Sequence, residues 1–143
     1  YTFSKYKVLW KEQTGSFSAV AVGSYLQSVP NANLSLIGGI DKPIVVDSKV
    51  LLLSTETFDE ALFVAGVLNS PSIRDIIDSY AVALNRGTDV VNYIKLPKFD
   101  AENETHKNIV VIADTIQKNI KSMSNKDLLD AERKLDQQIK LIF

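Results

Sequence analysis

Hydrophobic and polar residues alternate along the first part of the chain, which is typical of short β-strands. In residues 5–11 the two sets fall on opposite faces: Tyr6, Val8 and Trp10 on one, and Lys5, Lys7, Leu9 and Lys11 on the other. Residues 17–22 alternate again, with Phe17, Ala19 and Ala21 on one face. Apolar runs at 43–46 and 49–54 predict two short strands or one bent strand. Residues 27–39, rich in Ser, Asn, Pro and Gly, predict an irregular loop with a short strand near 34–37.

The apolar spacing becomes helical after residue 56. Thr57 and Glu60 have the spacing of a capping box, and apolar residues follow at helical intervals. Ser70 and Pro71 suit the cap and first position of a second helix. The buried stripe expected for that second helix consists of Ile73, Ile76, Ile77 and Tyr80.

The remainder of the chain predicts a short strand and a helical pair. A polar turn at 85–88 precedes an apolar run, 90–96, which predicts a strand that stops at Pro97. A helix is expected over 104–121, and Ser124 offers the cap of another. Both helices carry charged outer faces, which indicates an antiparallel pair.

These elements predict an α+β fold within a single domain, 1–143. A small N-terminal β-sheet of short strands is followed by two central helices, a short strand and a C-terminal helical pair. Residues 1–56 are expected to be mainly strands and loops, and 57–143 mainly helical. The length of 143 residues suffices for one buried core.

The composition narrows the possible functions. The chain has no cysteine, which excludes disulfides, thiolate metal sites and a cysteine nucleophile. Its 16 basic and 17 acidic residues leave a net charge of −1, whereas free-standing DNA-binding modules are usually basic. No apolar run approaches the roughly 20 residues of a membrane span, so no membrane partner is expected. The lack of cysteine fits a cytoplasmic location, which is the expected one. The only methionine is Met123, and the chain is expected to be a fragment of a longer protein.

Motifs for cofactor, metal or catalytic chemistry are missing. Gly38 and Gly39 lack the spacing of a phosphate-binding loop, and a single histidine does not suggest a zinc site. We therefore predict no catalytic, cofactor-binding or metal-binding residue. His106 is expected to be structural, in the first turn of a helix and hydrogen-bonded to the loop at 100–104.

Residues 93–106 carry the most informative motif. The run Ile-Lys-Leu-Pro-Lys-Phe-Asp at 94–100, with His106, follows a Leu-Asn-Ser-Pro segment at 68–71. This order resembles the C-terminal, target-recognition-type domain of adenine-specific DNA methyltransferases, especially those in fused type II restriction-modification enzymes. The resemblance extends from Lys5 to the C-terminus and is strongest over 59–106.

The resemblance implies a DNA target-recognition or DNA-binding role without methyl transfer, so the fragment is not expected to be an enzyme by itself. The implied partners are double-stranded DNA and the catalytic methyltransferase domain of the same parent chain. S-adenosylmethionine is implied for the parent protein, and no cofactor for this fragment.

Six basic residues are candidates for DNA contact, each also interpretable as an ordinary surface residue. Three lie along the first predicted strand, one lies in the polar turn beside Asp89, and two lie on either side of Pro97. They are Lys5, Lys7, Lys11, Arg86, Lys95 and Lys98. Tyr80 and Phe99 have the rings to stack on a base, but their positions favour the core.

Two other functions remain open. The chain could be a protein–protein or interdomain interaction module without DNA contact, docking through apolar positions of the last helix, Leu128, Leu135, Ile139 and Ile142. It could also be a small stand-alone enzyme, for which a concave polar pocket around His106 would be required.

Overall fold

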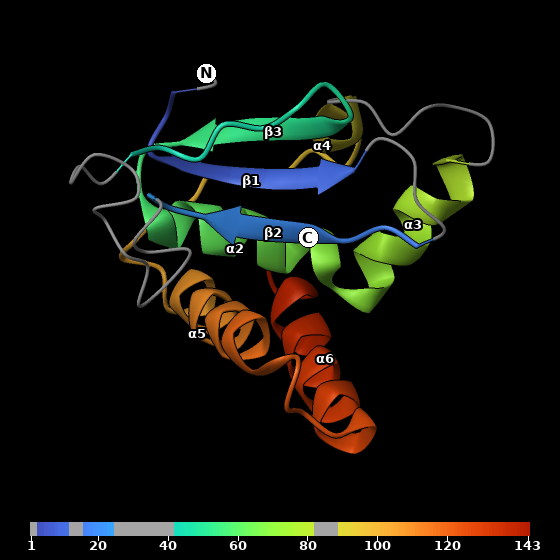
Figure 1. The fold of residues 1–143 in the computed structure, drawn as a ribbon. Coiled ribbons are helices and arrows are strands. Elements are labelled where there is room, and N and C mark those ends of the chain that lie inside the picture. The colour runs from blue at the N-terminus through green and yellow to red at the C-terminus, as the bar shows by residue number, and fades with distance from the viewer. Residues whose placement is uncertain (1–2, 12–15, 25–41, 82–88) are drawn as a thin grey trace.

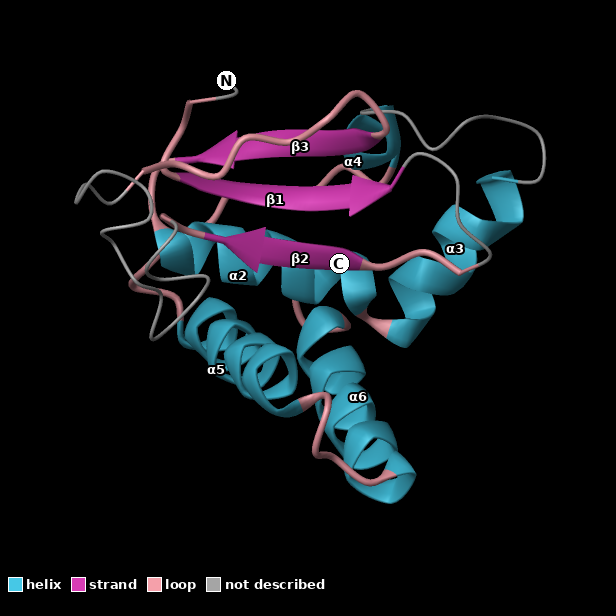
Figure 2. Cartoon of the chain, in the orientation of Figure 1, coloured by secondary structure: helices cyan, strands magenta, loops and turns pink. Residues whose placement is uncertain are grey.

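The computed structural model describes residues 3–11, 16–24, 42–81 and 89–143. In this part of the chain a small antiparallel sheet packs against helices, which confirms the α+β fold (Figures 1 and 2). The strands are β1 (Tyr6–Lys11), β2 (Ala19–Val22) and β3 (Val50–Thr55). The helices are α2 (Phe58–Asn69), α3 (Pro71–Ala81), α4 (Asp89–Tyr93), α5 (Glu104–Asn119) and α6 (Asn125–Ile139).

The sheet has the order β2-β1-β3, with β1 antiparallel to both neighbours. Val8 lies opposite Ala21 on one side and Leu53 on the other. Val8 and Trp10 are buried in the core as predicted, but Lys7 and Leu9 on the opposite face are buried too, so burial does not alternate along β1. In β2 the expected alternation holds for Ala19, Val20 and Ala21 but fails at Val22, which is buried instead of sharing the exposure of Val20.

Helix α2 lies between the sheet and the C-terminal helices (Figure 1). Every residue from 61 to 68 is buried, so this helix is apolar on all sides and forms the centre of the core. Gly66 permits the close approach of α5. A Cβ atom at this position would lie 3.0 Å from Ala113 Cβ and 3.0 Å from Ile109 Cγ2.

The capping predicted for the two central helices is confirmed for α2 but is wrong for α3. The Glu60 N–H donates to Thr57 Oγ1 at 3.1 Å, while the Glu60 carboxylate accepts from Glu56 N–H at 2.8 Å. The Ser70 hydroxyl donates to the Val67 carbonyl and thus helps to end α2 instead of capping α3.

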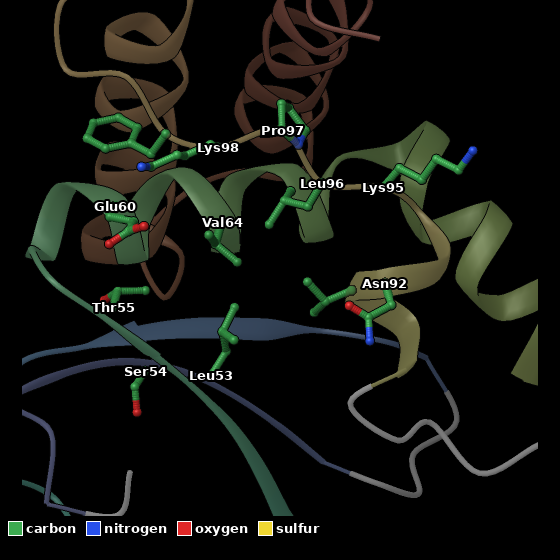
Figure 3. A pocket seen from close by; sticks show the side chains of 12 residues that line it. Leu53, Ser54, Thr55, Glu60, Val64, Asn92, Lys95, Leu96, Pro97 and Lys98 are labelled. Atoms are coloured by element: carbon green, nitrogen blue, oxygen red, sulfur yellow. The ribbon is translucent and has the colours of Figure 1, made fainter.

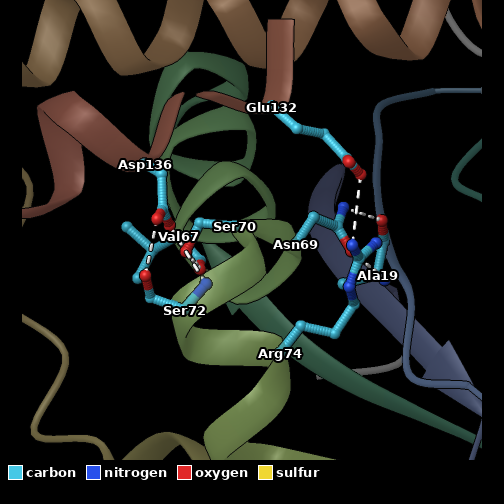
Figure 4. Close-up of polar contacts among 8 residues, drawn as sticks. All are labelled: Ala19, Val67, Asn69, Ser70, Ser72, Arg74, Glu132 and Asp136. Carbon is cyan, nitrogen blue, oxygen red and sulfur yellow. Dashed lines mark hydrogen bonds and ion pairs between the residues drawn. The ribbon is translucent and has the colours of Figure 1, made fainter. Parts of the chain in front are cut away.

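The cap of α3 comes from the distant helix α6. Asp136 accepts hydrogen bonds from the Ser72 N–H at 3.0 Å and from the Ser72 hydroxyl at 2.6 Å (Figure 4). Nearby, Arg74 pairs with Glu132 at 3.2 Å, a second link between α3 and α6. The N-terminus of α3 is therefore completed by tertiary structure.

The expected strand at 90–96 is wrong, because this segment forms α4 followed by a turn. The Lys95 N–H donates to the Asn92 carbonyl at 3.3 Å, which closes the turn. Val91 and Ile94, three positions apart, pack on the core as helical spacing allows. The other predicted strands differ in outcome. Residues 49–54 correspond to β3, residues 43–46 contribute only the bridge Ser24–Pro43, and 27–39 lies outside the described residues.

The C-terminal helices form the expected pair. Ser124 caps α6 through Asp127 N–H, and Asn108 near the start of α5 donates to Gln138 near the end of α6 at 3.3 Å. This joins opposite ends, as in an antiparallel pair. None of the helices within the described ranges has the length and apolar character needed to cross a membrane.

The outer edge of β2 is closed by two side-chain amides. Asn69, at the end of α2, donates to the Ala19 carbonyl at 2.6 Å and accepts from its N–H at 2.8 Å. Gln117 of α5 donates to the Ala21 carbonyl at 2.8 Å and accepts from its N–H at 2.9 Å. These amides occupy the main-chain groups that a further strand would use.

Candidate nucleic-acid interface

A cavity of about 320 Å³ lies between β3, the first turns of α2, α4 and the segment that follows α4 (Figure 3). Its walls combine apolar side chains with hydroxyl, amide and charged groups. The lining residues are Leu53, Ser54, Thr55, Glu60, Val64, Val91, Asn92, Lys95, Leu96, Pro97, Lys98 and Phe99. The conspicuous sequence motif therefore forms one wall of the cavity.

The core anchors this wall at two positions that are three residues apart. Leu96 and Phe99 pack against the buried cluster, and the Phe99 ring lies 5.3 Å from that of Phe63 between centroids. This confirms the prediction that Phe99 belongs to the core. Lys95 and Lys98 are exposed. The segment thus presents two ammonium groups from a backbone that the core holds in place.

His106 supports the same segment from behind. Its Nδ1 atom accepts a hydrogen bond from the Asp100 N–H at 3.0 Å, as expected for a structural histidine tied to the preceding loop. The ring is 6% exposed and lies 4.5 Å from the Phe63 ring and 6.1 Å from the Phe99 ring. His106 is not part of the cavity lining.

The two lysines occupy different ends of the cavity. In Figure 3 the Lys98 ammonium lies toward Glu60, whereas the Lys95 side chain extends away from the other labelled residues. Ammonium groups bind phosphates, and the Asn92 amide and the hydroxyls of Ser54 and Thr55 can donate and accept hydrogen bonds. The described residues contain no group of His, Cys, Asp and Glu suited to hold a metal ion.

The three lysines of β1 have different surroundings. Lys5 and Lys11 are exposed, and the Lys5 ammonium lies 5.1 Å from the centre of the Tyr6 ring. Lys7 is 0% exposed, and its Nζ donates to the Ile44 carbonyl at 2.6 Å. The expectation of a solvated lysine at position 7 is therefore wrong. Arg86 lies outside the described residues.

The burial of Lys7 also changes its acid–base behaviour. Removal of water from the ammonium lowers the pKa of Lys7 below its usual value of 10.5. A phosphate cannot reach a group without exposed surface, so Lys7 is no longer a candidate for DNA contact. Its role is to join β1 to the segment that contains Ile44.

A second concave surface, here called the aromatic groove, is formed by α3, α4 and the C-terminus. It has a volume of about 570 Å³ and is lined by Ile73, Ile76, Ser79, Tyr80, Tyr93, Ile94 and Phe143. The Tyr80 and Tyr93 rings lie 4.4 Å apart, and a hydrogen bond with the Tyr80 side chain raises the pKa of Tyr93 above its usual value. Tyr80 is 52% exposed, so its predicted place in the core is wrong.

The apolar positions predicted for docking in the last helix are largely used inside the domain. Leu135 and Ile139 are buried in the core. The aromatic groove was not predicted from the sequence. The available signal was Tyr93, which immediately precedes the motif at 94–100 and is exposed in the structure.

Comparison of the chain with models of protein families, with curated proteins and with solved structures finds no match.

Proposed function

We propose that this chain is a DNA target-recognition domain of a restriction-modification adenine DNA methyltransferase and is not catalytic by itself. The parent enzyme acts in the cytoplasm, binds S-adenosylmethionine in its catalytic domain, and contacts double-stranded DNA partly through this chain. The observation that carries the proposal is the anchored segment 95–99, which presents Lys95 and Lys98 beside a cavity with hydrogen-bonding groups.

The chemistry of this segment suits a nucleic-acid backbone. Exposed lysines neutralise phosphates, and hydroxyl and amide side chains bond to sugar, phosphate or base edges. A rigid support lowers the entropy lost when such groups bind, and Leu96 and Phe99 supply that support from the core. The sequence motif and two of the candidate contacts, Lys95 and Lys98, therefore fall in the same place.

The net charge of the chain determines how strongly we expect it to bind DNA. With a net charge of −1, the chain gains little from long-range attraction to DNA. Glu60, in the cavity wall, further reduces the local positive potential. We expect the isolated chain to bind DNA weakly, and the catalytic domain of the parent to supply further contacts.

The test is fluorescence anisotropy of a labelled duplex against the purified chain, beginning at low salt. Binding that weakens steeply as salt is added, and that weakens further in Lys98→Ala, supports the proposal. Lys126→Ala is the matched control, because this exposed lysine lies in the first turn of α6 outside the cavity lining. An equal loss in both variants, or no binding at low salt, contradicts it.

The second candidate is an interdomain docking module that binds the catalytic methyltransferase domain without touching DNA. The aromatic groove favours it, because Tyr80 and Tyr93 are more than half exposed and Tyr is enriched at protein interfaces. Loss of binding to that domain in Tyr93→Ala, in a chain that does not bind DNA at low salt, would select this candidate.

A further inference from the structure

Lys95 has an unusual backbone conformation. Among the described residues it is the one non-glycine residue with a positive φ, 50°. It lies two positions after the end of α4, where the chain turns. Left-handed residues beyond a helix end are usually Gly or Asn, because a Cβ atom crowds the neighbouring main chain. A lysine here makes the domain less stable than Gly or Asn would.

Within the described residues, the Lys95 side chain makes no polar contact that would explain this choice. Lys95 is exposed, and Figure 3 shows its ammonium directed away from the cavity walls. Within the described part of the chain it forms no ion pair, whereas Lys107 and Lys118 each pair with an acidic neighbour on their own helix. Among the described residues, no hydrogen bond or ion pair of the Lys95 side chain offsets this cost in stability.

We propose that Lys95 is a DNA-contacting residue whose ammonium binds a backbone phosphate, so that stability and binding oppose each other at this position. The inference rests on the proposed function and deepens it. Residues in disfavoured conformations concentrate at binding sites, where function outweighs the lost stability. Lys98 lies on the other side of Pro97, in the same cavity wall, and takes a separate phosphate.

Four substitutions separate backbone conformation from charge. Lys95→Gly and Lys95→Asn relieve the strain and remove the charge, Lys95→Met keeps the strain and removes the charge, and Lys95→Arg keeps both. Each full chain is measured twice: by thermal unfolding without DNA, and by anisotropy with a labelled mixed-sequence duplex over a series of salt concentrations.

We expect Gly and Asn to raise the melting temperature by a few degrees, and Met and Arg to leave it unchanged. The affinity for the duplex should fall about fivefold or more in Gly, Asn and Met, and the slope of log K against log salt should decrease in magnitude by about 1. Arg should retain both the affinity and the slope.

The outcomes distinguish this inference from the proposed function. Wild-type affinity in Lys95→Met, or no gain in stability in both Lys95→Gly and Lys95→Asn, overturns the role of Lys95. If Lys98→Ala weakens binding while the Lys95 variants do not, the proposed function stands and the inference fails. If the wild-type chain does not bind the duplex at low salt, both the proposed function and the inference about Lys95 fail.

Discussion

The side-chain amide of Asn69 pairs with the main chain of Ala19 in the way that a neighbouring strand would, with one hydrogen bond donated and one accepted. The two residues are 50 positions apart in the sequence. The pair therefore joins the end of α2 to the outer edge of β2 and protects that edge from intermolecular pairing.

Replacing this amide should weaken the fold and open the edge. In Asn69→Ala the N–H and carbonyl of Ala19 lose their partners, and we expect the free energy of unfolding to fall by about 1–3 kcal/mol. Urea unfolding measures the loss, and sedimentation velocity reports self-association of the opened edge. Asn108→Ala removes a single exposed hydrogen bond and should change neither, so equal behaviour of the two variants would contradict this role.

The buried ammonium of Lys7 should make stability depend on pH. Because burial lowers its folded pKa below 10.5, the unfolded chain binds more protons between the folded pKa and 10.5. The contribution of Lys7 to the free energy of unfolding therefore increases as pH rises through that interval. Below the folded pKa the lysine is charged in both states, and its contribution is constant.

The comparison with Lys7→Met isolates this effect, because all other titrating groups are common to both proteins. Urea unfolding from neutral pH to about 10.5 should show the difference in stability between wild type and variant shifting toward wild type as pH rises. A difference that stays constant across this range would mean that Lys7 keeps an ordinary pKa in the folded protein.

Gly66 should resist substitution although it lies in the middle of a helix. Alanine is favoured over glycine by about 1 kcal/mol in helix interiors. The new methyl group would lie 3.0 Å from Ala113 Cβ and Ile109 Cγ2, and overpacking of this kind typically costs about 1–3 kcal/mol. We expect Gly66→Ala to be net destabilising in chemical denaturation.

A double-mutant cycle tests the cause. Ala113→Gly makes room on α5, so the combination with Gly66→Ala should lose less stability than the sum of the single changes. Additive losses would show that the contact between α2 and α5 does not set the requirement for glycine.

His106 should affect stability through packing and one hydrogen bond. His106→Ala removes a ring packed beside Phe63 and Phe99 and leaves the Asp100 N–H without its acceptor. We expect a loss of about 2–4 kcal/mol. NMR spectra of the Asp100 amide provide a local readout, and its faster exchange with solvent in the variant is the expected result. An unchanged amide would argue against the hydrogen bond.

Local patterns predicted the fold where neighbouring residues decide the structure. Alternation located β1 and β2, and the Thr57–Glu60 spacing located the start of α2. The run at 90–96 misled because its apolar residues fit a strand and a helix equally well, and packing of Val91 and Ile94 decided the outcome.

The candidate site was predictable in part for the same reason. The motif at 94–100 identified the wall that carries Lys95 and Lys98. The burial of Lys7 depends on a carbonyl 37 positions away, and the exposure of Tyr80 depends on the placement of α3 beside α4. No property of the local sequence encodes such distant neighbours.

The capping of α3 by Asp136 has a consequence for the co-translational folding of this domain. During translation α3 leaves the ribosome before α6, so the start of α3 gains its carboxylate partner only after Asp136, 64 positions beyond Ser72, has been synthesised. The ion pair of Arg74 likewise forms only after Glu132 has been synthesised. The domain should therefore complete its fold on the ribosome only after α6 has emerged, and a product truncated within α6 should be removed by cellular proteases.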